Sequence, residues 1–358
     1  MEQKRLGDLA TYINGYAFKP EDRGKEGLPI IRIQDLTGNT YDLGFYNGDY
    51  PEKIEINDGD ILISWSASLG VYIWNRGKAL LNQHIFKVVF DKEEVNKQYF
   101  VFAVKYNLKE MGTKAHGATM KHIVKKDFDN TLVPFPTIEK QDVIAEILSK
   151  AAYIVDARKQ ELQKLDDLVR ARFVELFGDE NNSKNWSIVH IEDVADVQVG
   201  VVIKPSQYYT DESNGIKAFR SLNVGAGFIK DSDWVYFTAE GHQKNSKSIL
   251  RENDLLIVRS GAPGTACVVT EDYVGCNAID IIIAHPDCEK VNPYYLCTFT
   301  NMPHGKKQIV EGTGGAAQQH FNVGKYNKLQ LMLPPKELQD KFVEFINQIA
   351  KSKAAVQK

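Results

Sequence analysis

Short apolar runs, rich in β-branched and aromatic residues and bounded by turn-forming residues, recur along most of the 358-residue chain. Such runs are typical of β-strands. The runs expected to form strands are Ile30–Ile33, Ile61–Ser64, Val71–Trp74, Ile85–Phe90, Leu255–Val258 and Ile279–Ile283. A helix is expected after Asn96 and another after Asn292, because asparagine is a favoured N-cap residue and an apolar stretch follows each. The pattern therefore predicts mixed α/β structure.

A different pattern runs from Glu139 to Phe177, where neither proline nor glycine interrupts the chain before Gly178. Apolar residues recur there every seven positions, which predicts a long helix with a coiled-coil face. The heptad residues, which we expect to form a partner-docking surface, are Leu148, Val155, Leu162, Val169 and Leu176. At about 1.5 Å per residue this helix would be on the order of 55–60 Å long. We therefore expect it to act as a spacer.

The sequence contains an internal repeat, in which blocks of the first half return in the same order roughly 190 residues later. Asn57–Ile63 corresponds to Arg251–Ile257, and Gly117–Ala118 corresponds to Gly315–Ala316. The separation grows only between such blocks, where loops tolerate insertions. The chain is therefore predicted to contain two copies of one domain.

The second copy also ends in an expected helix, which begins near Lys336 and carries Phe342 and Ile349 on its apolar face. This helix matches the start of the long central helix but is shortened, because it has no counterpart of residues 161–178.

These patterns divide the chain into four expected segments. The expected fold class is α/β (α+β), with two pseudo-repeated mixed α/β domains separated by long coiled-coil helices. The segments are a first domain at 1–137, the central helix at 138–179, a second domain at 180–335 and the shortened closing helix at 336–358.

Composition and charge narrow the function. Hydrophobic residues make up 43% of the chain and charged residues 25%, which is usual for a globular protein. Lys+Arg 44 against Asp+Glu 47 gives a net charge of -3, so DNA binding would be confined to local surfaces and would be weak for the isolated chain. The sequence has neither an apolar run long enough to cross a membrane nor a signal peptide, and we expect a cytoplasmic protein.

Motifs for chemistry are missing from the sequence. The cysteines are Cys267, Cys276, Cys288 and Cys297. Their spacing of 9, 12 and 9 residues matches no zinc pattern, so we expect them to be small buried hydrophobes. Gly225–Gly227 is interpreted as a turn and Asn292–Tyr295 as a helix start, rather than as methyltransferase motifs. We expect no catalytic residue, no metal site and no cofactor in this chain.

Paired loops have a composition that suits contact with DNA. Lysine and arginine neutralise phosphates, glycine lets the backbone come close, and glutamine and arginine bond to base edges. The residues expected to bind DNA in the first half are Asn14, Gly15, Tyr16, Lys19, Trp65, Ser66, Lys114, His116, Thr119 and Lys121. Those in the second half are Gly200, Lys204, Arg259, Ser260, Thr265, Gln318, Gln319 and His320.

The two sets of loops differ in chemistry. Amides such as Gln318 take the place of lysines in the second half, so the halves are expected to read different bases. Taken singly, any one of these loops fits a solvated turn better than a DNA contact, but recurrence at matched positions in both halves favours DNA contact. Arg32 and Arg220, interpreted as lying inside apolar strands, are expected to be buried structural ion-pair partners rather than base readers.

The whole layout resembles the specificity subunit of type I restriction-modification systems. The motifs that carry the resemblance are Asn57–Ser64, Pro134–Gln141 and Arg172–Asp179. The resemblance implies two target-recognition domains that each read one half of a bipartite double-stranded DNA site, and two antiparallel helices that fix the gap. It also implies docked methyltransferase (modification) subunits and a restriction/translocase subunit. Those partners would bind S-adenosylmethionine, ATP and Mg, whereas the specificity subunit has no catalytic residues. The shortened closing helix departs from the family pattern.

Two other interpretations stay open on the sequence. One is a scaffold that contacts proteins but not DNA, with the heptad helix as its functional element. The other is a single-chain DNA methyltransferase or nuclease with an unrecognised active site. Binding of S-adenosylmethionine by the chain alone would favour this enzyme interpretation.

Overall fold

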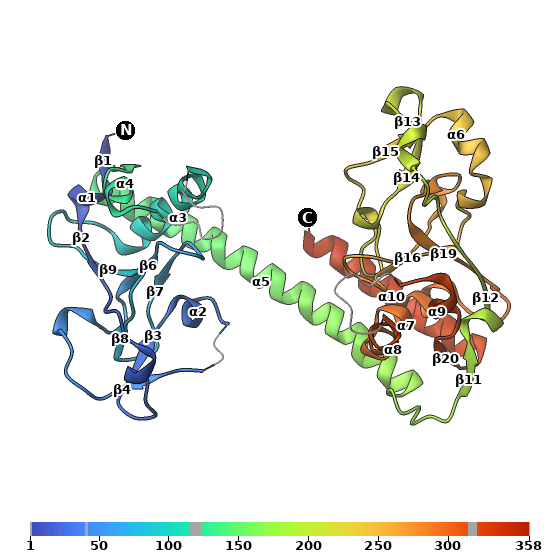
Figure 1. The fold of residues 1–358 in the computed structure, drawn as a ribbon, viewed down its shortest axis with the longest axis horizontal. Coiled ribbons are helices and arrows are strands. Elements are labelled where there is room, and N and C mark those ends of the chain that lie inside the picture. The colour runs from blue at the N-terminus through green and yellow to red at the C-terminus, as the bar shows by residue number, and fades with distance from the viewer. Residues whose placement is uncertain (1, 40–41, 115–122, 314–320, 358) are drawn as a thin grey trace. The chain divides into compact units, whose positions relative to one another are not determined.

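The computed structural model describes residues 2–39, 42–114, 123–313 and 321–357 (Figure 1). The chain divides into two compact units, which we call unit 1 (Met1–Ala157) and unit 2 (Arg158–Lys358).

Unit 1 contains two four-stranded sheets and one two-stranded ribbon (Figure 1). Its strands are β1 (Gln3–Arg5), β2 (Thr11–Asn14), β3 (Leu28–Ile31), β4 (Phe45–Tyr46), β5 (Glu55–Ile56), β6 (Ile61–Ser64), β7 (Gly70–Ile73), β8 (Ala79–Leu81), β9 (Ile85–Val89) and β10 (Leu132–Pro134). One sheet has the order β2-β9-β6-β7 and is antiparallel throughout. The other has the order β4-β3-β8-β5, in which β3 and β8 run parallel. β1 pairs with β10.

The helices of unit 1 divide between the cores of its two sheets. They are α1 (Leu6–Leu9), α2 (Ile33–Leu36), α3 (Lys97–Lys114), α4 (Lys125–Asp129) and the single turns η1 (Pro20–Asp22) and η2 (Glu52–Ile54). Ile61 and Ile63 of β6 belong to the core beneath α3, whereas Leu62 between them belongs to the core of the second sheet. Both faces of β6 are therefore buried, which explains its uninterrupted apolar sequence.

Unit 2 repeats this architecture. Its strands are β11 (Ser187–His190), β12 (Ala195–Val199), β13 (Tyr209–Thr210), β14 (Ile216–Phe219), β15 (Val235–Phe237), β16 (Leu255–Val258), β17 (Ala266–Val268), β18 (Asn277–Ala278), β19 (Ile281–Pro286) and β20 (Gln330–Leu333). Its sheets have the orders β12-β19-β16-β17 and β13-β15-β14-β18, and β11 pairs with β20. β14 and β18 run parallel, as β3 and β8 do in unit 1. The predicted duplication is confirmed. The first sheet has the same strand order in both units, whereas the second sheet shares three strands and differs in its fourth, which is β5 beside β8 in unit 1 and β13 beside β15 in unit 2.

The helices of unit 2 differ from those of unit 1 in several respects. They are α6 (Ala239–Lys244), α7 (Pro293–Asn301), α8 (Pro303–Thr313), α9 (Val323–Asn327), α10 (Lys336–Gln357) and the single turns η3 (Ile191–Asp193), η4 (Pro205–Tyr208), η5 (Glu212–Asn214), η6 (Ser221–Asn223), η7 (Ser246–Ser248) and η8 (Glu271–Tyr273). α7 and α8 stand where unit 1 has the single helix α3. Pro303 separates them, because proline cannot donate the hydrogen bond that would continue α7.

A hydrogen-bonded clamp joins unit 1 to the long helix α5 (Ile138–Phe177), which begins in unit 1 and ends in unit 2. The backbone N–H of Asn96 donates to Oε1 of Gln141 at 3.0 Å, and the Asn96 side-chain amide donates to Oδ1 of Asp142 at 2.7 Å. Nε2 of Gln141 donates to the carbonyl oxygen of Pro136 at 2.9 Å. Gln141 is fully buried, so the clamp fixes how the helix leaves the domain.

The same clamp joins unit 2 to α10. The backbone N–H of Asn292 donates to Oε1 of Gln339 at 2.8 Å, and its side-chain amide donates to Oδ1 of Asp340 at 2.7 Å. Nε2 of Gln339 donates to the carbonyl oxygen of Pro334 at 2.9 Å. Asn292 also caps α7 through Tyr294, as its sequence position predicts.

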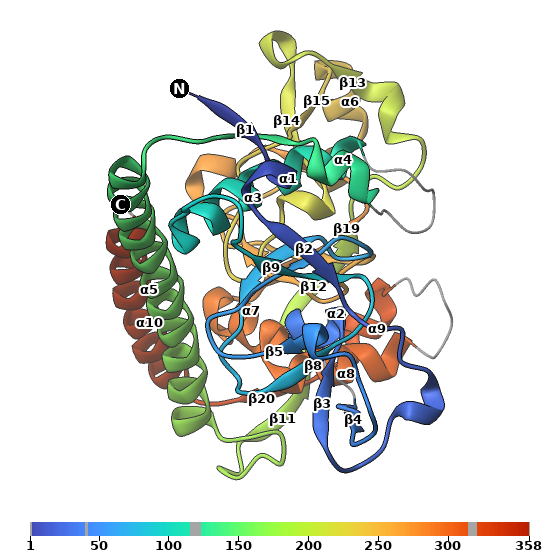
Figure 2. The same ribbon diagram turned by 90° about the vertical axis from the view of Figure 1, so that its left-hand side faces the viewer.

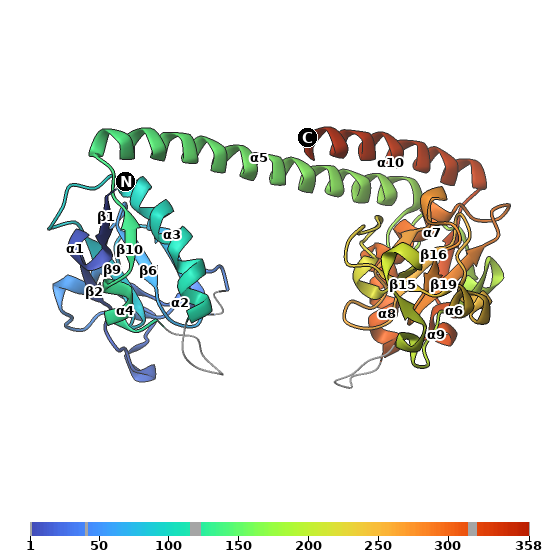
Figure 3. The same ribbon diagram turned by 90° about the horizontal axis from the view of Figure 1, so that it is seen from above.

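α10 packs against the second half of α5 within unit 2 (Figures 2 and 3). The ring of Phe342 lies 5.6 Å from that of Phe173 and 5.4 Å from that of Phe177, between centroids. Further along α10, Lys353 forms an ion pair with Asp166. Residue numbers rise along one helix as they fall along the other, so the pair is antiparallel. The expected antiparallel helix contact is confirmed for this half of α5.

The apolar sequence around Arg32 and Arg220 predicts that both lie inside strands, and this prediction is wrong. Each follows the last residue of its strand and stands at the N-terminus of a short helix. Nε of Arg32 donates to the buried carboxylate of Asp35 at 3.2 Å, which confirms a structural ion pair. Arg220 instead uses its backbone N–H on Oδ1 of Asn223, at 2.9 Å, and its guanidinium on the carbonyl oxygen of Asp233. Both arginines therefore hold turns together.

Three of the four cysteines are buried, as predicted, but Cys288 is exposed in the loop after β19. Burial raises the pKa of Cys276 to about 11 and that of Cys297 to about 12. These two thiols are therefore protonated near neutral pH and pack as apolar groups.

Candidate nucleic-acid interface

The loop after β2 contains three of the residues expected to bind DNA. A Cβ at Gly15 would lie 2.0 Å from the carbonyl oxygen of Asn82, so glycine is required here for close backbone approach. Tyr16, which is 45% exposed, and the exposed Lys19 follow it on the surface. Gly15 thus places the loop, while Tyr16 and Lys19 are accessible to a ligand.

The loop after β12 repeats this arrangement in unit 2. A Cβ at Gly200 would lie 2.2 Å from the carbonyl oxygen of Ala278, and Gly200 itself is buried. Lys204 is exposed and adopts a left-handed conformation with φ 44. Ile203 beside it is 78% exposed, which leaves an apolar side chain next to a cation on this loop.

Trp65 lies directly after β6 and gathers several expected residues. Its indole Nε1 donates to Oδ1 of Asn14 at 3.3 Å. Its ring stacks on Phe86 with centroids 5.6 Å apart and meets the imidazole of His84 edge-on at 5.0 Å. Ser66, the next residue, is buried and is placed to support the loop rather than to reach a ligand. The exposed edge of this cluster therefore comes from Asn14, Trp65 and His84.

Arg259 occupies the position of Trp65 in unit 2, directly after β16. Its guanidinium forms an ion pair with Asp280, and its Nε donates to the carbonyl oxygen of Phe321 at 3.2 Å. The backbone N–H of Phe321 donates back to the carbonyl oxygen of Arg259 at 3.1 Å. An arginine–aspartate pair thus replaces the aromatic cluster of unit 1 at the same place in the fold.

Six expected DNA contacts lie outside the described residues: His116, Thr119, Lys121, Gln318, Gln319 and His320. Lys114 is the last residue of α3. The residues that follow the two undescribed segments are anchored, however. Ile123 donates its N–H to the carbonyl oxygen of Trp65 at 2.9 Å, and Phe321 is bonded to Arg259. Ile123 and Phe321 are therefore each bonded to the residue that directly follows β6 or β16.

The remaining loop residues of unit 2 rest on α8. Nζ of Lys306 lies 3.3 Å from both the carbonyl oxygen of Pro263 and Oγ1 of Thr265, so the hydroxyl of Thr265 is engaged within the protein. Burial lowers the pKa of Lys306 to about 8. Ser260 is half-buried in the same loop. Lys306 was not among the residues expected to bind DNA, because nothing in the Lys306–Lys307 pair distinguishes a half-buried lysine from an exposed one.

The predicted docking stripe on α5 is divided by the fold. Leu148 and Val155 are 39% and 51% exposed, and Leu162 is intermediate. Val169 and Leu176 instead pack against the core of unit 2, where α10 also lies. These two residues are therefore partly covered within unit 2, and docking along all five residues stays a prediction.

His84 and Asp280 are the residues of this surface that the sequence did not single out. Each stands alone in its sequence, without a motif. The available signal was the repeat itself, since the two residues directly precede the equivalent strands β9 and β19. The expected strand Ile279–Ile283 is wrong at Asp280, which adopts a left-handed conformation before β19 begins.

Comparison with known proteins is informative once this geometry is established. The family described as "Type I restriction modification DNA specificity domain" matches residues 1–166 and 183–358. The chain belongs to this DNA specificity family. DNA recognition is therefore the function of this specificity subunit, and the two matches coincide with the duplicated architecture.

Named specificity subunits resemble the chain over most of its length. The EcoBI specificity subunit of Escherichia coli is 24% identical over 371 residues, covering 96% of this chain and 78% of that protein. The EcoKI specificity subunit of Escherichia coli strain K12 is 22% identical, with 96% and 81% covered. A solved S subunit of a type I restriction-modification system from M. genitalium has a TM-score of 0.57 at 15% identity, covering 99% of this chain and 92% of that one. The predicted fold class is confirmed.

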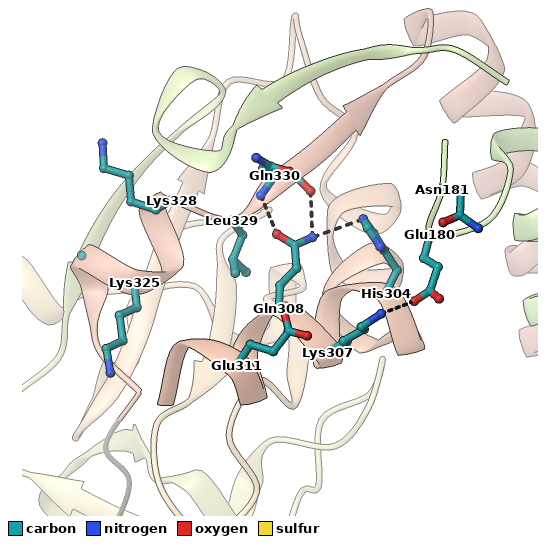
Figure 4. Close-up of a pocket in the computed structure, with 11 residues that line it drawn as sticks. Glu180, Asn181, His304, Lys307, Gln308, Glu311, Lys325, Lys328, Leu329 and Gln330 are labelled. Carbon is teal, nitrogen blue, oxygen red and sulfur yellow. Dashed lines mark hydrogen bonds and ion pairs between the residues drawn. The ribbon is translucent and has the colours of Figure 1, made fainter. Parts of the chain in front are cut away.

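A hollow in this specificity subunit lies between α8, α9 and the segment after α5 (Figure 4). It has a volume of about 560 Å³. Gln308 exchanges hydrogen bonds with the backbone of Gln330 at 2.8 and 3.0 Å, and Lys307 pairs with Glu180 at 3.2 Å. Burial lowers the pKa of His304, so its imidazole is neutral near neutral pH. These side chains hold one another in place.

The described part of the specificity subunit contains neither a membrane-spanning helix nor a cluster of metal ligands. No helix there is both long and apolar enough to cross a membrane. Likewise, no three histidine, cysteine, aspartate or glutamate side chains there are grouped as metal ligands would be.

Proposed function

We propose that each unit reads one half of a bipartite double-stranded DNA target. The observation that carries the proposal is one duplicated scaffold with different side chains at the same places. Trp65 and His84 in unit 1 correspond to Arg259 and Asp280 in unit 2. Contacts to base edges specify sequence, so a duplicated reader with changed contacts is expected to bind two different short sequences.

The spacing between the half-sites is assigned to α5 and α10. A continuous helix of 40 residues runs from one unit into the other, and α10 pairs with its second half. Linking two weak readers raises the effective affinity of both, provided that the linker length matches the distance between their sites. With a net charge of -3, the chain alone is expected to bind DNA weakly, and partners would supply many phosphate contacts.

We further propose that the chain has no catalytic role of its own. The relatives are named specificity subunits, and the functional loops contain base-reading and phosphate-binding side chains. S-adenosylmethionine, ATP and Mg would then be bound by methyltransferase and restriction/translocase subunits.

The first half of α5 is the surface that we assign to methyltransferase docking. Large apolar side chains are exposed along it, at 57%, 60%, 39%, 58% and 51%, and they are Val143, Ile147, Leu148, Ile154 and Val155. Contiguous exposed apolar surface of this kind is typical of protein contacts. Charged residues introduced there are expected to prevent docking.

The docking assignment is tested by the double variant Ile147→Glu with Ile154→Glu. These residues are seven positions apart and share one helix face. Copurification with a co-expressed methyltransferase subunit should be lost. The control Gln160→Glu adds a charge on the opposite face and should copurify normally. Normal copurification of the double variant would move docking to another surface.

The reading function is tested by co-expressing the chain with a candidate methyltransferase subunit and selecting bound sequences from randomised duplexes. A bipartite motif with a fixed gap is expected. Exchange of one unit for that of a relative should change one half of the motif only. A stable complex that enriches no motif would favour the protein scaffold interpretation instead.

A further inference from the structure

The turns that lead into β9 and β19 share an unusual backbone feature. His84 has φ 71 and Asp280 has φ 49, so a residue with a side chain occupies the left-handed region at the same place in both units. Only glycine enters this region without steric cost. Such strain persists where the surrounding structure holds it, and it is concentrated at functional positions.

Both turns are held between loops already assigned to DNA contact. In unit 1, the N–H of Gln83 donates to the carbonyl oxygen of Tyr16 at 2.9 Å. In unit 2, the N–H of Asp280 donates to the carbonyl oxygen of Val201 at 3.1 Å. The side chain of Asp280 reaches Arg259 from there, and that of His84 reaches Trp65. Each turn therefore connects the loop after the first strand with the loop after β6 or β16, through Gln83 and His84 in unit 1 and through Asp280 alone in unit 2.

The Arg259–Asp280 pair leaves part of the arginine available. A guanidinium has five N–H donors. Nε of Arg259 is used on Phe321, and one Nη on Asp280. The Arg259 side chain is only 16% exposed, so these two bonds fix its direction, whereas the Asp280 side chain is 43% exposed. A guanidinium fixed in this way has more N–H donors than these two bonds use, and its planar fork suits bidentate bonding to O6 and N7 of guanine.

We propose that Asp280 is a positioning residue for sequence reading: it orients Arg259 toward a guanine in the half-site bound by unit 2. The inference rests on the proposed function. Unit 1 carries His84 and Trp65 at these positions, with neither the carboxylate nor the guanidinium, so its half-site lacks this guanine contact. The exchange of one pair for the other makes this position a determinant of the difference between the two half-sites.

The test compares base preferences of variants in complex with the methyltransferase subunit. Wild type should select a G·C pair at one position of the half-site of unit 2. Arg259→Lys keeps the charge but loses the fork, and should lower that preference by about tenfold or more. Asp280→Asn keeps a residue that tolerates the left-handed region while removing the charge, and should lower the preference by about fivefold. The half-site of unit 1 should stay unchanged in both variants.

A double variant separates positioning from a general structural effect. If Asp280 acts through Arg259, then Asp280→Asn in the Arg259→Lys background adds no further loss of preference. Asp233→Asn is the matched control: it makes the same change at another left-handed residue, with φ 56, whose side chain accepts a hydrogen bond from Ser232 and forms no ion pair with Arg259. It should leave both half-sites and the melting temperature as in wild type.

Three outcomes would count against the inference. Unchanged G·C preference in Arg259→Lys would overturn it while leaving bipartite reading intact. Equal relaxation of both half-sites by Asp280→Asn, or a further loss in the double variant, would assign Asp280 a structural role instead. No motif selected by wild type would overturn the proposed function together with this inference.

Discussion

The two units have one fold but different surfaces. The strand order of the first sheet, the parallel strand pair of the second sheet and the clamp to the outgoing helix are the same in both. By contrast, the loop after β6 presents Trp65 beside an imidazole, whereas the loop after β16 presents Arg259 beside a carboxylate. Buried positions thus maintain the scaffold, and a few surface positions are changed to read another sequence.

The outgoing helices show a second contrast. α10 is covered by α5 along its aromatic face, while the corresponding first part of α5 has exposed apolar residues. Two helices of similar sequence pattern therefore have different partners. α10 packs inside unit 2, whereas the first part of α5, by our proposal, binds a partner subunit.

Removing an aromatic ring from the α5–α10 contact should have the largest effect on stability. Phe342→Ala is expected to cost about 3–5 kcal/mol, because the ring is fully buried among other rings. Ile144→Ala, at the corresponding position of α5, should cost less than about 2 kcal/mol, since Ile144 is only half-buried. Urea unfolding followed by hydrogen exchange would measure each loss. Equal losses would contradict the contrast between the two helices.

Breaking either clamp should lower the free energy of unfolding by a similar amount in the two units, and by less than Phe342→Ala does. Gln141→Leu and Gln339→Leu each leave a buried backbone N–H without its acceptor, for about 1–3 kcal/mol each. Gln163→Leu on the exposed face of α5 is the control and should be close to neutral. Thermal melting of the three variants is the measurement. If one of the two clamp variants melts like wild type, the two clamps contribute differently to stability.

Lys306 should give unit 2 a pH dependence. Its pKa is lowered to about 8 by burial, so between about pH 8 and the ordinary lysine range the unfolded state binds the extra proton. The stability of unit 2 should therefore rise through this window, by about 1 kcal/mol after allowance for solvent screening. Lys306→Met should remove the rise. Urea unfolding at a series of pH values checks this, and a persistent rise in the variant would assign it to another group.

The smallest expected effects concern single DNA contacts. Lys114→Ala with Lys121→Ala should weaken binding to all sequences by a similar factor and reduce the salt dependence, because lysine contacts phosphates. Gln318→Ala or Gln319→Ala should instead relax the preference in one half-site only. Sequence selection at two salt concentrations distinguishes these results. A glutamine variant with an unchanged preference would not be a base reader.

Much of the architecture could be predicted from sequence because it depends on local pattern and on the repeat. β6 and β16 were predicted with their observed bounds, since buried strands are continuous apolar runs. The helix caps at Asn96 and Asn292 follow from residue type alone. Arg32 was assigned to a strand because apolar residues flank it, although Ile33 already begins a helix.

The surface contacts could not be predicted in the same way. Arg259 and Asp280 are far apart in sequence, and their meeting depends on how two sheets are joined by a left-handed turn. The heptad pattern is the same at Val155 and Val169, yet only the second residue is covered. Burial of a helix face depends on which element packs opposite it, and a one-dimensional pattern does not contain that information.

The duplicated clamp has a consequence for how specificities arise. Asn96 and Asn292 make the same bonds to a glutamine and an aspartate at the first turns of the outgoing helix. A domain exchanged together with its clamp residues therefore keeps the same hydrogen-bonded connection to its outgoing helix. Recombination or engineering that keeps the clamp residues can exchange one DNA-reading domain for another. The helices α5 and α10, to which we assign the spacing between the half-sites, are then preserved. New DNA targets then become combinations of existing parts rather than new folds.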